Sequence, residues 1–145
     1  MTVTFFGHGD APRGVKKEVE KAVEALIVLG ADTFYVGNNG FFDVLVKEVL
    51  RKIKAKYPHI AYAVVAAYFP KKYSDESKDM IYPEFLEAVS EKAAIPARNE
   101  WLVRNSDAVV AYVERRQGGA YRFCSYAKKC GKIVINVSKK QKGSL

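Results

Sequence analysis

The chain has 145 residues, of which 49% are hydrophobic, and this size and composition are typical of one domain that buries its own core. Lysine and arginine exceed aspartate and glutamate by 24 − 16 = 8, a surplus that favours phosphate-bearing partners without choosing between a nucleotide and a nucleic acid. Cys124 and Cys130 form neither a CxxC pair nor a disulfide framework, and no apolar run is long enough to span a bilayer, so we expect a cytoplasmic protein without a membrane anchor.

Strand-like and helical patterns alternate in the first half of the chain. Runs of β-branched and aromatic residues end at glycine, as buried strands do where they enter a tight turn. Between these runs, apolar residues recur at helical spacing with charged residues on the opposite face, which predicts helices packed on a sheet. In chain order, the predicted elements are a strand at 2–6, a helix from Pro12 to Gly30, a strand at 32–36, a helix at 41–56 and a strand at 59–68.

The second half begins with a polar stretch at 69–83 that has no clear period, and such a long excursion predicts a functional lid. Its Tyr73 and Tyr82 fit two roles equally well, stacking on a base or sealing the loop. The alternation then resumes. Its predicted elements are a short helix at 84–92, a helix from Pro96 to Arg104, a strand at 107–113, a helix at 120–129 and a strand at 132–137.

This alternation predicts an α/β fold, a Rossmann-like three-layer sandwich with a mainly parallel sheet of about five strands and helices on both faces. Residues 1–138 would form one domain, and the basic residues 139–145 a disordered tail. In such a sheet the carboxyl ends of the strands share one edge, and ligands bind there. The strand-to-helix junctions are therefore the place to search for a site.

Four junctions carry glycine or small polar residues that let a backbone come close to a ligand. Two of them, GNNG and QGGA, directly precede helices, whose unpaired N–H groups and positive dipole end favour an anion. None matches GxGxxG or the Walker motif, which disfavours a nicotinamide enzyme and a phosphate-loop ATPase. The four junctions are GHGD at 7–10, GNNG at 37–40, RN at 98–99 and QGGA at 117–120.

Polar side chains near these junctions supply further candidates. Asp43 lies in the first turn of its helix, where it either accepts hydrogen bonds from a ribose, the role we prefer, or only stabilises the helix dipole. His8 lies at the carboxyl end of the first strand, whereas His59 lies at the opposite edge and is structural, so no metal site is predicted. Arg98 fits two roles equally well, a fork for phosphate or a salt bridge to a nearby carboxylate. Asp10 is predicted to cap the first helix.

Residues 2–137 contain, in order, the stretches TFFGHGD, FYVGNNGFFDVLV, YPHIAYAVVAAYFP, RNEWLVRNSDAVVAYV and GGAYRFCSYAKKCGKIVINV. Their order and spacing resemble the small YpsA-like branch of the SLOG superfamily, relatives of the lonely-guy and DprA Rossmann-like domains. The resemblance implies a domain that binds nucleotides or ligands derived from them. Within the superfamily, lonely-guy members hydrolyse the N-glycosidic bond of nucleoside monophosphates, DprA binds single-stranded DNA, and modules of bacterial immune effectors sense ADP-ribose-like signals.

Two departures from the family pattern bear on activity. The arginine expected after the first strand is Gly9 here, and Arg13 is the replacement charge available nearby. The lonely-guy motif PGGxGTxxE corresponds to QGGAYRFCS, which keeps both glycines and lacks the acidic residue. Without that carboxylate, an oxocarbenium-like transition state has no evident electrostatic partner. We therefore predict a binding protein with no catalytic residue, cofactor or metal.

The leading prediction is a protein that senses or sequesters a nucleotide-derived small molecule, such as an ADP-ribose-like or cyclic-nucleotide signal. The alternatives are a nucleotide N-glycosidase of the lonely-guy type and a single-stranded nucleic-acid-binding module, whose binding we expect to be weak. A homo-oligomer is expected because Phe41, Phe42, Trp101 and Phe123 are more large aromatics than one small sheet needs. The predicted ligand contacts are Gly7, His8, Gly37, Asn38, Asn39, Gly40, Asp43, Arg98, Asn99, Gly118, Gly119 and Ala120.

Overall fold

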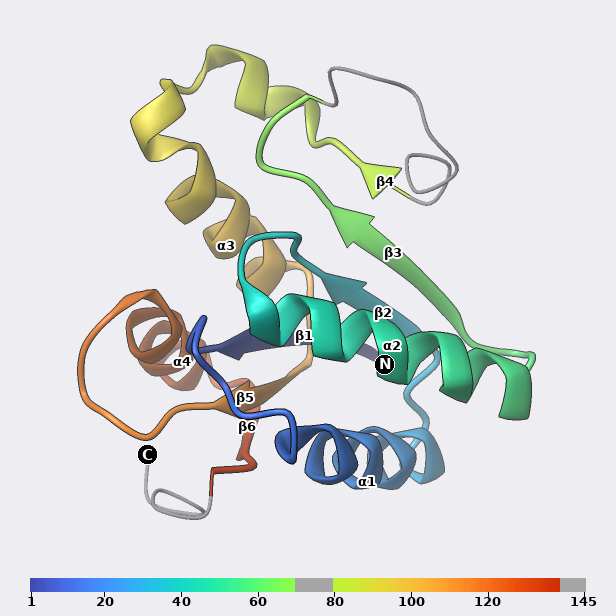
Figure 1. Ribbon diagram of the computed structural model, residues 1–145. Helices are drawn as coiled ribbons and strands as arrows, with labels where there is room; N and C mark the ends of the chain where they lie inside the picture. The colour runs from blue at the N-terminus through green and yellow to red at the C-terminus, as the bar shows by residue number, and fades with distance from the viewer. Residues whose placement is uncertain (70–79, 139–145) are drawn as a thin grey trace.

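The computed structural model describes residues 1–69 and 80–138, which form a three-layer α/β sandwich around a parallel sheet (Figure 1). The described part of the sheet has six strands in the order β4-β3-β2-β1-β5-β6, and every neighbouring pair is parallel. The strands are β1 (Thr2–Gly7), β2 (Thr33–Val36), β3 (Ala61–Val65), β4 (Met80–Ile81), β5 (Ala108–Tyr112) and β6 (Ile133–Asn136).

The order of the strands has its switch point between β1 and β5, which are neighbours in the sheet but distant in the chain. From β1 the chain moves outward through β2 and β3 to β4, and then returns to place β5 on the other side of β1. These two central strands pair along their whole length, from Val3 opposite Ala108 to Gly7 opposite Tyr112. In open parallel sheets, such a switch point leaves a crevice at the carboxyl ends of the two strands. The strand order alone therefore places a candidate site at the carboxyl ends of β1 and β5.

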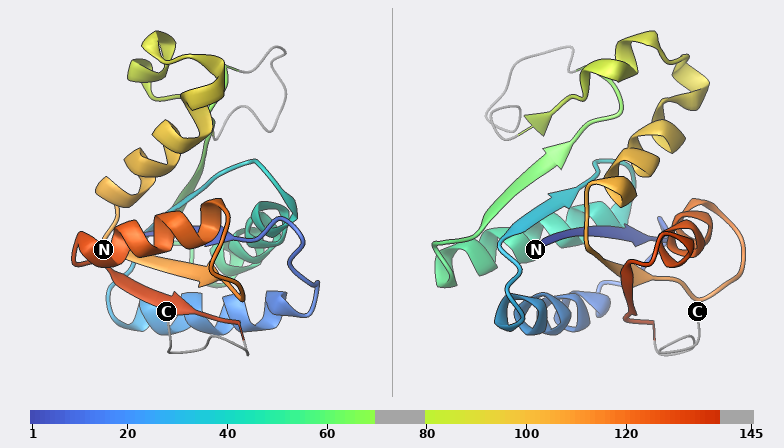
Figure 2. Two further views of the ribbon diagram at one scale, coloured as in Figure 1. Left: turned by 90° about the vertical axis from the view of Figure 1, so that its left-hand side faces the viewer. Right: turned by 180° about the vertical axis from the view of Figure 1, so that it is seen from behind.

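Four α-helices cover the two faces of the described sheet, α1 and α2 on one face and α3 and α4 on the other (Figure 2). Their apolar stripes account for this packing, because the stripe residues on α1 and α4, such as Val19, Val23 and Cys124, are fully buried. The α-helices are α1 (Val15–Val28), α2 (Phe41–Lys56), α3 (Ala94–Arg104) and α4 (Gly119–Lys129), and two short 3₁₀ helices, η2 (Glu84–Ala88) and η3 (Glu91–Ala93), precede α3.

Successive side chains of the central strands pack into two separate hydrophobic cores, one on each face of the sheet. Phe5 packs in the core under α1 and α2, whereas Phe6 packs in the core under α3 and α4, where its ring stacks on Phe123 at 5.8 Å. On β5, Val109 and Val110 divide between the two cores in the same way. Burying a phenylalanine side chain contributes roughly 1.5–3 kcal/mol, so both central strands are strongly fixed. The edge where β1 and β5 end is therefore a rigid base for a site.

The predicted Rossmann-like sandwich is confirmed, and the differences lie in single elements. The helix expected at 84–92 is instead the two 3₁₀ helices η2 and η3. The short strand β4 was not predicted, and the strand expected at 59–68 is shorter. Two helix starts that were predicted from prolines are wrong. Pro12 lies in a turn before α1, and α3 begins before Pro96. Proline is tolerated throughout the first turn of a helix, so it does not mark the first residue. None of the described helices is long and apolar enough to cross a membrane. Tyr73 and the expected tail at 139–145 lie outside the described residues.

Candidate functional site

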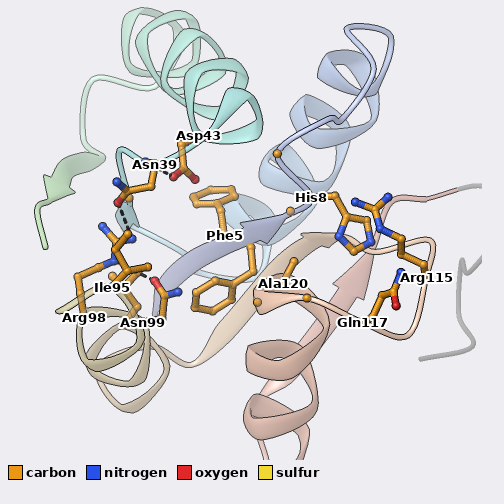
Figure 3. A pocket seen from close by; sticks show the side chains of 17 residues that line it. Phe5, His8, Asn39, Asp43, Ile95, Arg98, Asn99, Arg115, Gln117 and Ala120 are labelled. Carbon is orange, nitrogen blue, oxygen red and sulfur yellow. Dashed lines mark hydrogen bonds between the residues drawn. The ribbon is translucent and has the colours of Figure 1, made fainter. Parts of the chain in front are cut away.

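An open pocket of about 590 Å³ lies at the carboxyl ends of β1 and β5, at the switch point of the sheet. Figure 3 shows two polar walls with Phe5 and Ala120 between them. We call them the amide wall, formed by Asn39, Asp43, Arg98 and Asn99, and the cationic wall, formed by His8, Arg115 and Gln117. Asn38 and Gly40 do not line the pocket. The predicted contacts that do line it are Gly7, His8, Gly37, Asn39, Asp43, Arg98, Asn99, Gly118, Gly119 and Ala120.

Arg98 is a buried clamp at the base of the amide wall, with only 2% of its surface exposed. Its Nη1 donates to the carbonyl of Val65 at 2.9 Å, and its Nη2 and Nε donate to the side-chain oxygens of Asn39 and Asn99, each at 2.8 Å. Burial lowers the pKa of Arg98, and the Asp43 carboxylate opposes this shift. Among the described residues, no ion pair joins Arg98 to a carboxylate, so neither of its two predicted roles is decided there. The guanidinium instead ties the ends of β3, α3 and the loop before α2 together.

Asp43 performs the helix-start role that the sequence offered as its second interpretation. Its Oδ2 accepts a hydrogen bond from the backbone N–H of Asn39 at 2.9 Å. Burial raises the pKa of Asp43, while this hydrogen bond and Arg98 lower it. A Cβ on Gly37 would be a tight fit, because it would lie 3.0 Å from Asp43 Oδ2 and 3.1 Å from Arg98 Cζ. The ribose role of Asp43 stays a prediction.

His8 is buried in the cationic wall, with 4% of its surface exposed, and it holds the loop after β5. The backbone N–H of Glu114 donates to His8 Nε2 at 3.1 Å, which assigns the imidazole proton to Nδ1. Burial, with help from Arg115, lowers the pKa of His8, whereas Asp10 and Glu114 raise it. The imidazole is therefore neutral at pH 7 and positions the loop without adding charge.

Arg115 is a second arginine that lines the pocket, besides Arg98, and the sequence analysis missed it. Its guanidinium faces the Asp10 carboxylate, with Nη2 at 3.1 Å from Oδ1 and Nη1 at 3.5 Å from Oδ2; Asp10 is exposed and Arg115 is half-buried. This hydrogen bond lowers the pKa of Asp10. The predicted capping role of Asp10 is wrong, because Gly14 occupies the N-cap of α1 and no side chain caps it. Arg13, the expected replacement charge, pairs instead with Glu48 at 3.5 Å.

The amino terminus of α4 opens into the pocket without any side chain in the way. Gly118 has φ +92°, a left-handed conformation that favours glycine, and no atom lies within 4 Å of a Cβ built on Gly118 or Gly119. No side chain caps this helix and its first turn carries no acidic residue. Its first N–H groups have no partner within the helix, so with the helix dipole they favour an anion.

The start of α2 differs, although its sequence repeats the pattern. Gly40 has φ +111°, and a Cβ there would lie 3.5 Å from the Cα of Gly9, so the chain approaches itself closely at this point. The Asp43 carboxylate already occupies the positive end of the α2 dipole. The pocket is thus asymmetric: the α4 side carries free N–H groups and Arg115, whereas the α2 side carries amides, the Asp43 carboxylate and the hydrogen-bonded guanidinium of Arg98.

No family model matches the chain. Its sequence is 29% identical over 128 residues to a UPF0398 protein of Halalkalibacterium halodurans, in a match that covers 79% of this chain and 68% of that protein. Its structure is similar to that of DNA processing protein A (DprA) from Helicobacter pylori, studied for its single-stranded DNA binding mode, with a TM-score of 0.61 at 17% identity. The structural match covers 94% of this chain and 64% of that one.

The structural similarity shows a DprA-like fold. At 17% identity the structural likeness shows the fold alone, and this chain spans less than two thirds of the DprA structure. The YpsA-like branch of the superfamily stays a prediction.

Proposed function

We propose that the pocket binds one nucleotide of a single-stranded nucleic acid, with its phosphate at the amino terminus of α4. The observation that carries the proposal is the convergence of an uncapped glycine helix start with Arg115, across the pocket from amide groups. Support also comes from the DprA-like fold, since the similar Helicobacter protein binds single-stranded DNA. The net charge of +8 suits an anionic polymer.

The phosphate would lie against the cationic wall. Backbone N–H groups at Gly119 and Ala120 supply donors, and Gly118 leaves room for the anion because it has no Cβ. Arg115 supplies a planar fork suited to phosphate oxygens. Its present partners are the Asp10 carboxylate at 3.1 Å, which is 67% exposed, and the Glu114 carboxylate at 3.7 Å, which is 28% exposed. Exchanging the exposed pair with Asp10 for a phosphate costs little.

The nucleoside would lie toward the amide wall. Arg98 binds the carbonyl oxygen of both Asn39 and Asn99, which leaves each amide NH₂ group as a donor for a base edge or a sugar hydroxyl. Apolar side chains also line the pocket, among them Phe5 and, beside Arg98 and Asn99, Ile95 (Figure 3). Apolar side chains together with a few fixed polar groups are typical of sites for small organic groups such as bases.

The test uses Gly119→Val, with Gly14→Val as its matched control. Gly14 is also an open glycine at a helix start, but it does not line the pocket. We expect Gly119→Val to weaken binding of a labelled 20-mer of thymidylate at least tenfold in fluorescence anisotropy, because the valine side chain occupies the phosphate position. The control should bind like wild type, and the thermal midpoints of both variants should stay within a few degrees. Equal binding by Gly119→Val and wild type would refute the proposal.

A second candidate is a nucleotide-derived small molecule, such as an ADP-ribose-like or cyclic-nucleotide signal. The pocket volume of about 590 Å³ favours it, since small-molecule sites commonly have about 300–1,000 Å³. Salt separates the two candidates. A single strand held through six phosphates should lose about 300-fold in affinity between 50 and 200 mM salt, whereas a ligand that neutralises one to three cations should lose far less. Tight, salt-insensitive binding of ADP-ribose without oligonucleotide binding would reverse the ranking.

A further inference from the structure

A second depression runs along the outer face of α4, which we call the α4 groove. It is about 700 Å³ in volume and is lined by Tyr121, Arg122, Ser125, Tyr126 and Lys129. We propose that the α4 groove binds the nucleotides adjacent to the one held in the pocket, so that the partner is a polynucleotide strand and not a mononucleotide. This inference rests on the proposed function and adds a second subsite to it.

The α4 groove is continuous with the pocket. Gly118 and Gly119 line both, so the pocket and the groove meet at the glycine pair where the phosphate is proposed to lie. A strand leaving that phosphate would pass directly onto the outer face of α4. This helix has 11 residues and is about 16 Å long, which is room for more than one further nucleotide. No other described helix or strand lies in front of α4 in the left view of Figure 2.

Charge on the groove suits a phosphate backbone. Helix α4 carries three basic residues and no carboxylate, and two of the basic side chains, Arg122 and Lys129, line the groove two turns apart. Lys129 in the last turn also complements the helix dipole, which is the ordinary explanation for a basic residue there. Arg122 is different, because a cation near the amino terminus opposes the dipole. An anion bound beside it would offset that cost.

Aromatic side chains alternate with these cations. Tyr121 and Tyr126 are half-buried and pack against the core under α3 and α4, so their rings are held in place. The hydroxyl of Tyr126 accepts a hydrogen bond from Arg104 Nε at 3.2 Å, which further fixes that ring. Fixed aromatic rings beside cations form the stacking surface that single-stranded nucleic acids use without regard to sequence.

The occupant follows from the charge. A second copy of this chain would bring the same basic face against itself, and like charges would oppose such a contact. Elsewhere, helix α2 is also basic, but Lys52 and Lys56 pair with Glu20 and Glu24 on α1 at 3.0 Å. The α4 groove has no carboxylate among its lining residues, so it suits an anionic strand.

The test compares Arg122→Ala/Lys129→Ala with Lys17→Ala/Arg51→Ala, which removes two exposed basic residues from α1 and α2. We measure affinity for a 20-mer of thymidylate and for thymidine monophosphate across a salt series. The groove variant should bind the 20-mer at least tenfold more weakly, with a salt slope lower by about 1.4, because each phosphate contact to a single strand contributes about 0.7. Its affinity for the monophosphate should match that of wild type, and the control should differ from wild type only slightly with both probes.

The outcomes separate the two proposals. A groove variant with the wild-type affinity and salt slope for the 20-mer would overturn the α4 groove while leaving the pocket standing. Equal affinity of the wild type for the monophosphate and the 20-mer would also overturn the α4 groove and leave the pocket standing. Wild type that binds neither probe would refute both proposals. Since Arg122 also lies over the Phe123 ring at 5.1 Å, Arg122→Gln/Lys129→Gln is measured in parallel to keep part of that packing.

Discussion

His8 is a buried imidazole whose unprotonated Nε2 holds the loop after β5 through the Glu114 N–H. Protonating that nitrogen would replace an acceptor with a donor facing a donor. Burial and the neighbouring Arg115 already lower the pKa of His8, so the neutral form is the one the fold requires. The loop that carries Arg115 and the α4 glycines therefore depends on the charge state of one residue.

Acid should weaken the fold through His8. Because its folded-state pKa lies below 6.5, the unfolded chain binds more protons, and stability falls as the pH drops below about 6.5 toward the folded-state pKa. His8→Gln keeps an acceptor near the Nε2 position and cannot titrate, so its stability should depend less on pH over this range. Urea unfolding at pH 5, 6 and 7 measures both proteins, and His59, present in each, cancels in the comparison. Parallel pH profiles would contradict the assignment.

The place of Arg115 in the pocket could not be predicted from the sequence around it. Its partner Asp10 lies 105 positions away, and only the pairing of β1 with β5 brings the two loops together. The available signal was a pair of arginines, Arg115 and Arg116, separated from the glycine pair by Gln117, but no local pattern says which one faces the pocket. Arg98 was predicted as a site residue for its charge, whereas its three hydrogen bonds to neutral acceptors depend on folding.

The packing of α2 against the end of β1 explains the need for glycine at position 7 better than contact with a ligand does. Gly7 ends β1 directly beneath Phe42 of α2, which is 1% exposed. A Cβ on Gly7 would lie 2.6 Å from Phe42 Cδ1 and closer still to Cγ, within the ring itself. The glycine lets α2 approach the end of β1, and this approach shapes one side of the pocket.

Gly7→Ala should therefore destabilise the fold by at least the 1–3 kcal/mol typical of an overpacked core, with a fall of several degrees in the thermal midpoint. Gly9→Ala is the matched control in the same turn, where a Cβ meets no atom within 4 Å, and its midpoint should change little. Adding Phe42→Leu to Gly7→Ala should recover part of the loss, because the smaller side chain relieves the overlap. Equal midpoints for the two alanine variants would show that this packing argument is wrong.

The predicted bounds of an element were correct where a glycine sets the bound. They were wrong where a proline was interpreted as the start of a helix. Helix α2 runs from Phe41 to Lys56 as predicted, since GNNG ends β2 and the left-handed Gly40 starts the helix. Proline marks only a permitted first-turn position, so Pro12 and Pro96 did not fix the starts of α1 and α3. The strand β4 follows a stretch with no period, and its two residues carry no pattern that could predict it.

At the scale of the whole molecule, the alternation of elements was enough to predict a shared carboxyl edge, and with it most residues of the pocket. The order of the strands was not predictable, because each parallel pairing depends on contacts between distant residues. The distribution of charge also emerges only in three dimensions. Part of the basic face of α2 pairs with α1 through Lys52 and Lys56, whereas the α4 groove has no carboxylate among its lining residues.

The prediction of a homo-oligomer now depends on fewer residues. Phe42 and Phe123 are buried, and Trp101 is half-buried against Tyr35 at 5.6 Å, so the fold itself explains three of the four aromatics. Phe41 remains 39% exposed, and Val44, one turn along α2, is 42% exposed. A stable interface buries about 800 Å² on each partner, far more than two side chains offer. Any association through this patch should therefore be weak.

Light scattering across a concentration series tests that expectation. The mass of wild type should rise from 16.2 kDa toward twice that value only at high concentration, because the patch is small and the net charge of +8 opposes contact. Phe41→Ser/Val44→Ser should remain at 16.2 kDa throughout. Val28→Ser/Leu29→Ser, which removes two exposed apolar side chains at the far end of α1, is the control and should behave like wild type. A constant wild-type mass of 16.2 kDa would rule out self-association, and the pocket would then have to function within one chain.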